Sequence, residues 1–128
     1  MAHNPVVWFE IYVQDMARAQ RFYEDVLQCK LQPLTPPDSV AGGTKMLAFP
    51  MDMAAPGTGG MLVQMAGVHS GGGGTLVYFG CDDCALPQGR VLAAGGRIDK
   101  PKFAIGPYGF IALVVDTEGN CVGLHSMQ

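Results

Sequence analysis

The stretch WFEIYVQDMARAQRFY, residues 8–23, decides how the chain begins to fold. Its first half is rich in β-branched and aromatic residues, which predicts a strand over residues 6–13 that is buried on at least one face. Asp15 is a good N-cap, and the apolar residues after it recur at a spacing of three to four. We therefore expect an amphipathic helix to about residue 27. Glu10 does not fit, because it is a charged group in an apolar strand.

Short apolar segments separated by Gly, Pro and Asp follow this helix, and each has the length of a strand. The second half of the chain then repeats the order of one strand, one helix and three strands. Further strands are expected within residues 30–34, 44–51, 59–66, 74–81, 97–103, 108–116 and 119–127. A short second helix, ended by Gly95 and Gly96, is expected within residues 82–96, with Pro87 at its first position because proline has no backbone N–H to donate.

The two halves form an internal repeat. A shift of 68 positions places Asp15 on Asp83, and a later shift of about 64 places residues 46–52 on residues 110–116. Such a repeat predicts one domain over residues 1–128, built from two modules. Module one is expected at about 5–67 and module two at about 75–128, with a glycine-rich seam at about 68–74 that we expect to be too flexible to be structured.

Composition excludes several classes of function. The net charge is −3 and the basic residues are scattered, so we expect no nucleic-acid partner. Apolar runs are too short for a membrane span, so we expect no membrane partner. The N-terminus lacks the pattern of a secretory signal, and we expect a cytoplasmic protein.

The four cysteines are expected to be reduced thiols rather than a disulfide framework. Only Cys81 and Cys84 have the spacing of a motif. Two aspartates lie between them and oppose formation of a thiolate, which argues against a redox pair. The sequence leaves the role of these two cysteines open.

Three segments carry a family resemblance: VWFEIYVQDMARAQRFYEDVL (7–27), GTLVYFGCDD (74–83) and IGPYGFIALVVDTEGNCVGLHS (105–126). They resemble the vicinal oxygen chelate superfamily, which includes glyoxalase I, bleomycin resistance proteins and extradiol dioxygenases. The resemblance extends over essentially the whole chain. It implies an α+β fold of two βαβββ modules whose mixed sheets curl around a cleft, and it implies a homodimer.

The resemblance also implies a divalent metal held by one side chain from each of four strands. Those positions fall on Trp8, Leu76, Gly123 and, with the register undecided, either Val63 or Gln64. Trp and Leu offer no ligand atom for such a cation, and Gly has no side chain. We therefore expect the usual metal site to be absent and predict no cofactor.

A relocated metal site stays open as an alternative. Glu10 and His125 would supply two ligands, Gln64 a third and Tyr78 a weak fourth. A metal-dependent glyoxalase or dioxygenase would then be possible with ligands in new places.

Strand alternation offers an explanation for Glu10. Trp8, Glu10 and Tyr12 share one face of their strand, and the same parity places Tyr78 and His125 beside the other ligand positions. We expect Glu10, Tyr78 and His125 to line one cavity. If the protein is a binding protein, we expect this cavity to enclose a small, partly apolar molecule. The residues expected to contact that molecule are Trp8, Tyr12, Met61, Gln64, Met65 and Tyr78.

Two other interpretations of the same residues remain. In a metal-independent lyase or isomerase, Glu10 and His125 would act as acid and base, because a carboxylate beside an imidazole favours the cation. Alternatively, the two residues form a structural hydrogen-bonded pair, since buried charges are rare unless they are paired.

Overall fold

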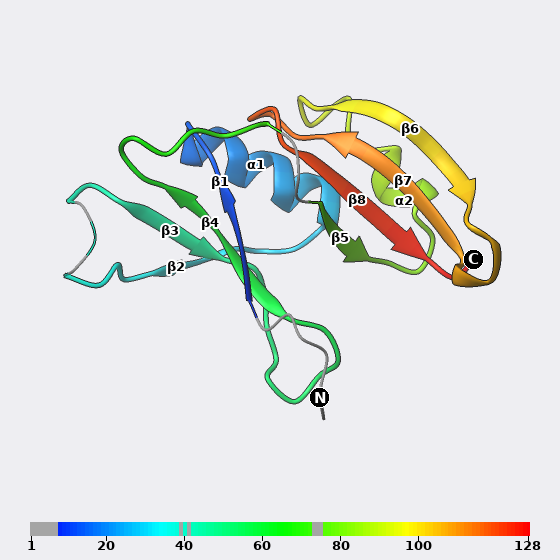
Figure 1. Ribbon diagram of the computed structural model, residues 1–128, viewed down its shortest axis with the longest axis horizontal. Helices are drawn as coiled ribbons and strands as arrows, with labels where there is room; N and C mark the ends of the chain where they lie inside the picture. The colour runs from blue at the N-terminus through cyan, green and yellow to red at the C-terminus, as the bar shows by residue number, and fades with distance from the viewer. Residues whose placement is uncertain (1–7, 39, 41, 73–75) are drawn as a thin grey trace.

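The computed structural model describes residues 8–38, 40, 42–72 and 76–128. Figure 1 shows two four-stranded sheets side by side, the first coloured blue to green and the second dark green to red. The strands are β1 Trp8–Tyr12, β2 Gln32–Leu34, β3 Lys45–Ala48, β4 Gly59–Gln64, β5 Val77–Gly80, β6 Arg97–Ala104, β7 Phe110–Val115 and β8 Cys121–Ser126. The helices are α1 Met16–Leu27, α2 Ala85–Gln88 and the short 3-10 helix η1 Gly106–Tyr108.

Both sheets have the same topology. The strand order is β1-β4-β3-β2 in the first sheet and β5-β8-β7-β6 in the second, and in each the outer pair, β1 with β4 or β5 with β8, is parallel. This confirms the predicted α+β fold of two βαβββ units, with mixed sheets that do not close into a barrel. All eight predicted strands are present, although residues 6 and 7 of the first and residues 74 and 75 of the fifth lie outside the described residues. Among the described residues, no helix is long and apolar enough to span a membrane.

The predicted first helix, α1, begins directly after its predicted N-cap residue, Asp15. The Asp15 carboxylate accepts a hydrogen bond of 3.1 Å from the backbone N–H of Arg18, which satisfies one of the unpaired donors of the first turn. The buried face of α1 is formed by residues spaced three to four apart: Met16, Ala19, Phe22, Tyr23 and Val26. α1 packs with this face against the first sheet at β4 and also contacts α2.

The second helix differs from its prediction. α2 covers only Ala85–Gln88, so Pro87 occupies the third helical position rather than the first. Proline is tolerated there because the first-turn N–H groups have no partner within a helix. The chain continues to Gly95 in successive turns, such as the bond from the Val91 N–H to the Gln88 carbonyl, rather than in a regular helix.

The glycine-rich seam is more ordered than the sequence predicts. Ser70 donates a hydrogen bond of 2.6 Å to the backbone carbonyl of Glu118, and the Gly71 N–H donates one of 2.7 Å to the Asn120 side chain. The carbonyl of Val68 accepts a bond from the Gln14 amide. The seam up to residue 72 is thus held against both modules, while residues 73 and 74 lie outside the described residues.

One aromatic cluster joins the two sheets. Phe79 of β5 lies with its ring centroid 5.2 Å from that of Phe49, 5.8 Å from Phe9 and 5.9 Å from Tyr23, all three of which belong to module one. Aromatic rings at these separations gain contact energy beyond the burial of their area. The core is therefore shared by the modules.

The turn between β7 and β8 fastens the second sheet to the start of α1. Glu118 in this turn has a fully buried side chain, and its carboxylate accepts backbone N–H bonds from Gln14 (2.9 Å) and Asp15 (3.0 Å). Arg18 adds two bonds, of 2.7 and 2.8 Å, and Thr117 adds one of 2.7 Å. Burial alone would raise the pKa of Glu118, but these hydrogen bonds outweigh it and lower the pKa to about 2.

Asp116 organises the same turn. Its carboxylate accepts a hydrogen bond of 2.7 Å from the buried Tyr23 hydroxyl and two of 2.8 Å from the backbone N–H groups of Glu118 and Asn120. Burial raises the pKa of Tyr23 well above its usual value, and the Asp116 charge and hydrogen bond raise it further. Tyr23 therefore stays a neutral donor, and every buried side-chain polar atom of the described residues has a partner.

We predict that Glu118→Gln destabilises the protein by about 2–3 kcal/mol at pH 7, because it removes a buried charge that five donors satisfy. A folded pKa of about 2 lies below the ordinary glutamate pKa of 4.5, so this stabilisation is complete above pH 4.5 and is lost as the pH falls through about 2. Urea unfolding at pH 7 and pH 3 measures both effects.

The control for this prediction is Asp25→Asn, which removes one carboxylate from an exposed position on α1. We expect it to change the free energy of unfolding by less than about 0.5 kcal/mol. Equal losses for the two variants, or an unchanged pH dependence in Glu118→Gln, would show that Glu118 does not fasten the modules.

Candidate functional site

Side chains of β1 divide between two faces of the first sheet. Ile11 is buried in the core together with Leu62, its partner on β4. Trp8, Glu10 and Tyr12 alternate with these core residues and lie on the opposite, open face.

The pairing of β1 with β4 settles the register that the sequence leaves undecided. Glu10 pairs with Met61 and Tyr12 pairs with Val63, so Met61 and Val63 share the face of Glu10 and Tyr12, although both are themselves buried. Val63 rather than Gln64 therefore occupies the fourth position at which the resemblance places a metal ligand.

Gln64 lies on the core side of β4, and its side chain binds the first residue of α1. Its side-chain oxygen accepts a hydrogen bond of 2.8 Å from the backbone N–H of Met16, at the first position of the helix. The prediction that Gln64 belongs to the ligand wall does not agree with this placement. The physical reason is the strand period of two, which turns consecutive residues to opposite faces.

An aromatic ring covers a glycine on the open face of the second sheet. Tyr78 pairs with Gly123, and a Cβ atom added to Gly123 would lie only 2.2 and 2.3 Å from two atoms of the Tyr78 ring. Trp8 similarly lies over Gly59 on β4, at 3.1 Å from an added Cβ. Tyr78 thus fills the space that a side chain at position 123 would need.

The four positions of the usual metal site do not fit a metal ion. Trp8, Val63 and Leu76 carry no ligand atom, and the place of a side chain at Gly123 is taken by the Tyr78 ring. The described residues also contain no group of three or more His, Cys, Asp or Glu side chains that could hold a metal. The relocated site around Glu10 and His125 stays a prediction, although the Gln64 side-chain oxygen, its expected third ligand, already accepts a hydrogen bond from the Met16 N–H.

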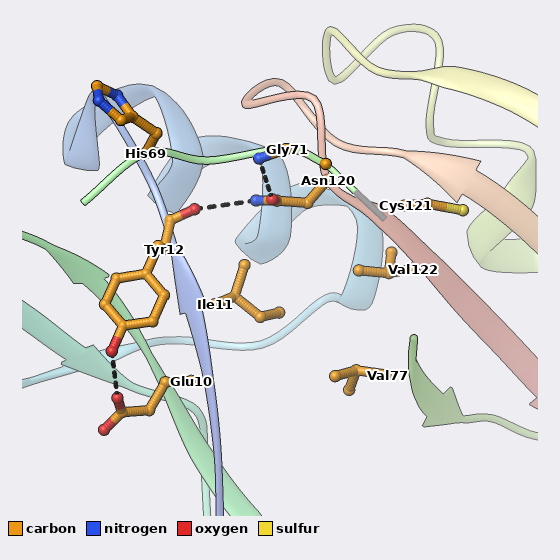
Figure 2. Close-up of a pocket in the computed structure, with 10 residues that line it drawn as sticks. Glu10, Ile11, Tyr12, His69, Gly71, Val77, Asn120, Cys121 and Val122 are labelled. Atoms are coloured by element: carbon orange, nitrogen blue, oxygen red, sulfur yellow. Dashed lines mark hydrogen bonds between the residues drawn. The ribbon is translucent and has the colours of Figure 1, made fainter. Parts of the chain in front are cut away.

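A pocket of about 320 Å³ lies between β1 and the edge of the second sheet (Figure 2). Its apolar part is built from Ile11 of β1, Val77 of β5 and Val122 of β8. We call it the seam pocket, because the seam between the modules forms one of its walls. Its described lining is Glu10, Ile11, Tyr12, His69, Gly71, Gly72, Val77, Asn120, Cys121 and Val122.

Glu10 and Tyr12 form a hydrogen-bonded pair in the lining of the seam pocket. The Tyr12 hydroxyl donates to Oε1 of Glu10 at 2.7 Å (Figure 2). The pKa of Tyr12 is raised, first by this hydrogen bond and then by burial and the Glu10 charge. Tyr12 is therefore neutral at pH 7 and holds the carboxylate in one orientation.

Asn120 fixes the upper wall of the seam pocket. Its amide nitrogen donates to the Tyr12 carbonyl at 3.0 Å and to Asp116 at 3.0 Å, and its amide oxygen accepts the Gly71 N–H. Figure 2 shows Asn120 between Tyr12 and Gly71. One side chain thus ties β1, the seam and the β7–β8 turn together.

The structure brings only part of the predicted site together. Glu10 and Tyr12 line the seam pocket, whereas Tyr78 and His125 lie on the open face of the second sheet, outside the described lining. Trp8, Met61 and Met65 are also outside it. Sequence reasoning did not find the other lining residues, which are Ile11, His69, Gly71, Gly72, Val77, Asn120, Cys121 and Val122. Of these, Cys121 has the parity of Gly123 and His125 and was within reach of the same argument.

Cys81 and Cys84 are free thiols, as are the other two cysteines. The pKa of the Cys81 thiol is raised, first by burial and then by neighbouring Cys84 and Asp83. Cys84 is buried, and its backbone N–H donates to the Ser126 hydroxyl at 3.0 Å. A raised thiol pKa works against the redox chemistry that the Cys-x-x-Cys spacing permits.

Residues 6–41 match a family model described as bleomycin resistance protein-like N-terminal. Glyoxalase I from Zea mays is 24% identical with a TM-score of 0.71, covering 96% of this chain and 46% of that one, so this chain spans about half its length. A glyoxalase-related enzyme from Fulvimarina pelagi is 18% identical with a TM-score of 0.65, covering 97% and 88%.

A glyoxylase/bleomycin resistance protein/dioxygenase domain from Frankia sp. EAN1pec is 15% identical, with a TM-score of 0.68 and coverage of 98% and 99%. No curated protein matches the sequence of this chain. At these identities the solved structures establish the fold.

We predict that Gly123→Ala destabilises the protein by about 1–2 kcal/mol, because the new methyl group forces the Tyr78 ring from its place. Gly80→Ala is the matched control, since a Cβ at Gly80 meets nothing within 4 Å. Urea unfolding measures both. Tyr78→Ala combined with Gly123→Ala should cost less than the sum of the single changes, and simple additivity would contradict the contact.

Proposed function

We propose, on the premise that this chain has the glyoxalase/bleomycin resistance/dioxygenase fold, that it binds a small, partly apolar molecule in the seam pocket without a metal ion. The observation that carries the proposal is the composition of that pocket. Three branched aliphatic side chains form one part, and the oriented Glu10–Tyr12 pair forms another. Pockets that bind small molecules are mostly apolar, with a few placed polar groups that fix orientation.

The size of the pocket fits this role. A volume of about 320 Å³ lies near the lower end of the range of about 300–1,000 Å³ that is usual for small-molecule sites. The wall is also held in place before a ligand arrives, because Asn120 and Tyr12 are already hydrogen-bonded. A preformed site loses less conformational freedom on binding.

The lyase or isomerase alternative gains no comparable support. It needs Glu10 and His125 at one reacting centre, whereas only Glu10 is part of the described lining of the seam pocket. The polar partner of Glu10 in the structure is Tyr12. Homodimerisation and a cytoplasmic location remain predictions.

A direct test uses indole as a neutral, partly apolar probe. We expect indole to shift the backbone amide NMR signals of Val77, Cys121 and Val122 at millimolar concentration, equally with and without a chelator, and to be recovered unchanged. Cys121→Phe should abolish these shifts because the ring fills the pocket. Val115→Phe is the matched control, since Val115 is the cross-strand partner of Cys121 and does not line the pocket.

Two results would overturn the proposal. Indole shifts confined to residues away from the pocket would show that the pocket does not bind it. Shifts that appear only after a divalent metal is added would show that the site depends on metal.

A further inference from the structure

Glu10 supplies the formal negative charge in the seam pocket, and no Lys or Arg is among its described lining residues. Tyr12 is kept neutral, as described above. The thiol of Cys121 is also held neutral at pH 7, because burial first and then the charge of Asp99 raise its pKa. His69 is exposed and lies at the opposite end of the pocket from Glu10 in Figure 2.

Three hydrogen-bond donor groups of the lining are already committed to partners within the protein. The Tyr12 hydroxyl donates to Glu10, the Asn120 amide donates to Tyr12 and Asp116, and the Gly71 N–H donates to Asn120. An anionic ligand needs donors of this kind. These groups therefore leave an anion little to bind, and the Glu10 carboxylate would repel it.

The Glu10 carboxylate, by contrast, still has acceptor capacity. Oε1 accepts the Tyr12 hydroxyl, whereas Oε2 accepts no hydrogen bond from the described residues. A carboxylate has about four lone-pair sites, so it accepts several further bonds. Because Tyr12 holds the carboxylate, less side-chain freedom is lost when a cation binds to it.

We propose that the ligand of the seam pocket is a small organic amine in its protonated form. Its ammonium group donates to Glu10, and its apolar body lies against Ile11, Val77 and Val122. Tyr12 is a positioning residue that orients the carboxylate. This inference rests on the proposed binding function and narrows it to one class of ligand.

The test compares three probes of nearly equal size: 2-phenylethylamine, 2-phenylethanol and phenylacetate. Titrations followed at the amide signals of Val77 and Val122 give the dissociation constants. We expect the amine to bind about tenfold or more tightly than the alcohol, and phenylacetate to bind most weakly, because a hydrogen bond to a charged group is worth about a factor of ten or more. Raising the salt concentration should weaken only the amine.

Glu10→Gln keeps the shape of the side chain and removes its charge. In this variant we expect the amine and the alcohol to bind equally. Asp25→Asn, which removes one carboxylate from an exposed position outside the pocket lining, should leave the tenfold preference unchanged. A preference that survives Glu10→Gln, or that is lost in Asp25→Asn, would show that Glu10 does not select the amine.

The outcomes separate this inference from the proposed function. Equal binding of amine and alcohol to the natural chain would overturn the amine assignment and leave the binding function standing, as would tighter binding of phenylacetate. If none of the three probes shifts the pocket signals at millimolar concentration, the binding function itself fails and the amine assignment fails with it.

Discussion

The rest of the structure depends on the buried carboxylate of Glu118. It lies in the turn between β7 and β8, yet its partners are the backbone of Gln14 and Asp15 and the guanidinium of Arg18, about a hundred positions earlier in the chain. A fully buried charge is tolerated only where its hydrogen bonds replace those of water. Because four of the five donors belong to module one and the acceptor belongs to module two, this requirement fixes how the two sheets meet.

These hydrogen bonds between the modules also determine the shape of the seam pocket. β1 ends beside the β7–β8 turn, and Asn120 of the turn holds both the Tyr12 carbonyl and the Gly71 N–H. β1 and β5 are outer strands of separate sheets, so no ladder of backbone hydrogen bonds joins the sheets among the described residues. The pocket is the space that remains between the sheets when the turn and the aromatic cluster set their positions.

Much of the fold follows from patterns within short segments. The alternation in residues 8–12, the Asp15 cap and the period of α1 are local, and the internal repeat then fixes the topology of the second half. The second helix is short, as predicted, but its end and the position of Pro87 in it were mispredicted, because first-turn N–H groups need no helical partner and the start of a helix is set by its surroundings. The seam was mispredicted because its partners, Glu118 and Asn120, are distant in sequence.

The candidate site shows where strand parity stops being sufficient. Parity placed Glu10 and Tyr12 on one face of β1 and Tyr78 and His125 on one face of the second sheet, but it contains no information on the angle and offset between the sheets. The angle and the offset depend on the hydrogen bonds that Glu118 accepts from module one and on the packing of Phe79 among aromatic rings of module one. Residues such as Val77 and Val122 face the core, and they border the pocket only because two sheet edges are held apart there.

The place of Glu10 in an apolar strand follows from these constraints. Its face of β1 points away from the core, so the carboxylate costs little desolvation, and Tyr12 two residues later is near enough to donate to it. In the proposed amine site, the orientation of Glu10 by Tyr12, rather than burial, gives the carboxylate its preference for a cationic ligand. An exposed ion pair is usually weak because two mobile side chains must be ordered. Here one of the two is ordered in advance, at the edge of an apolar pocket that supplies the remaining contact.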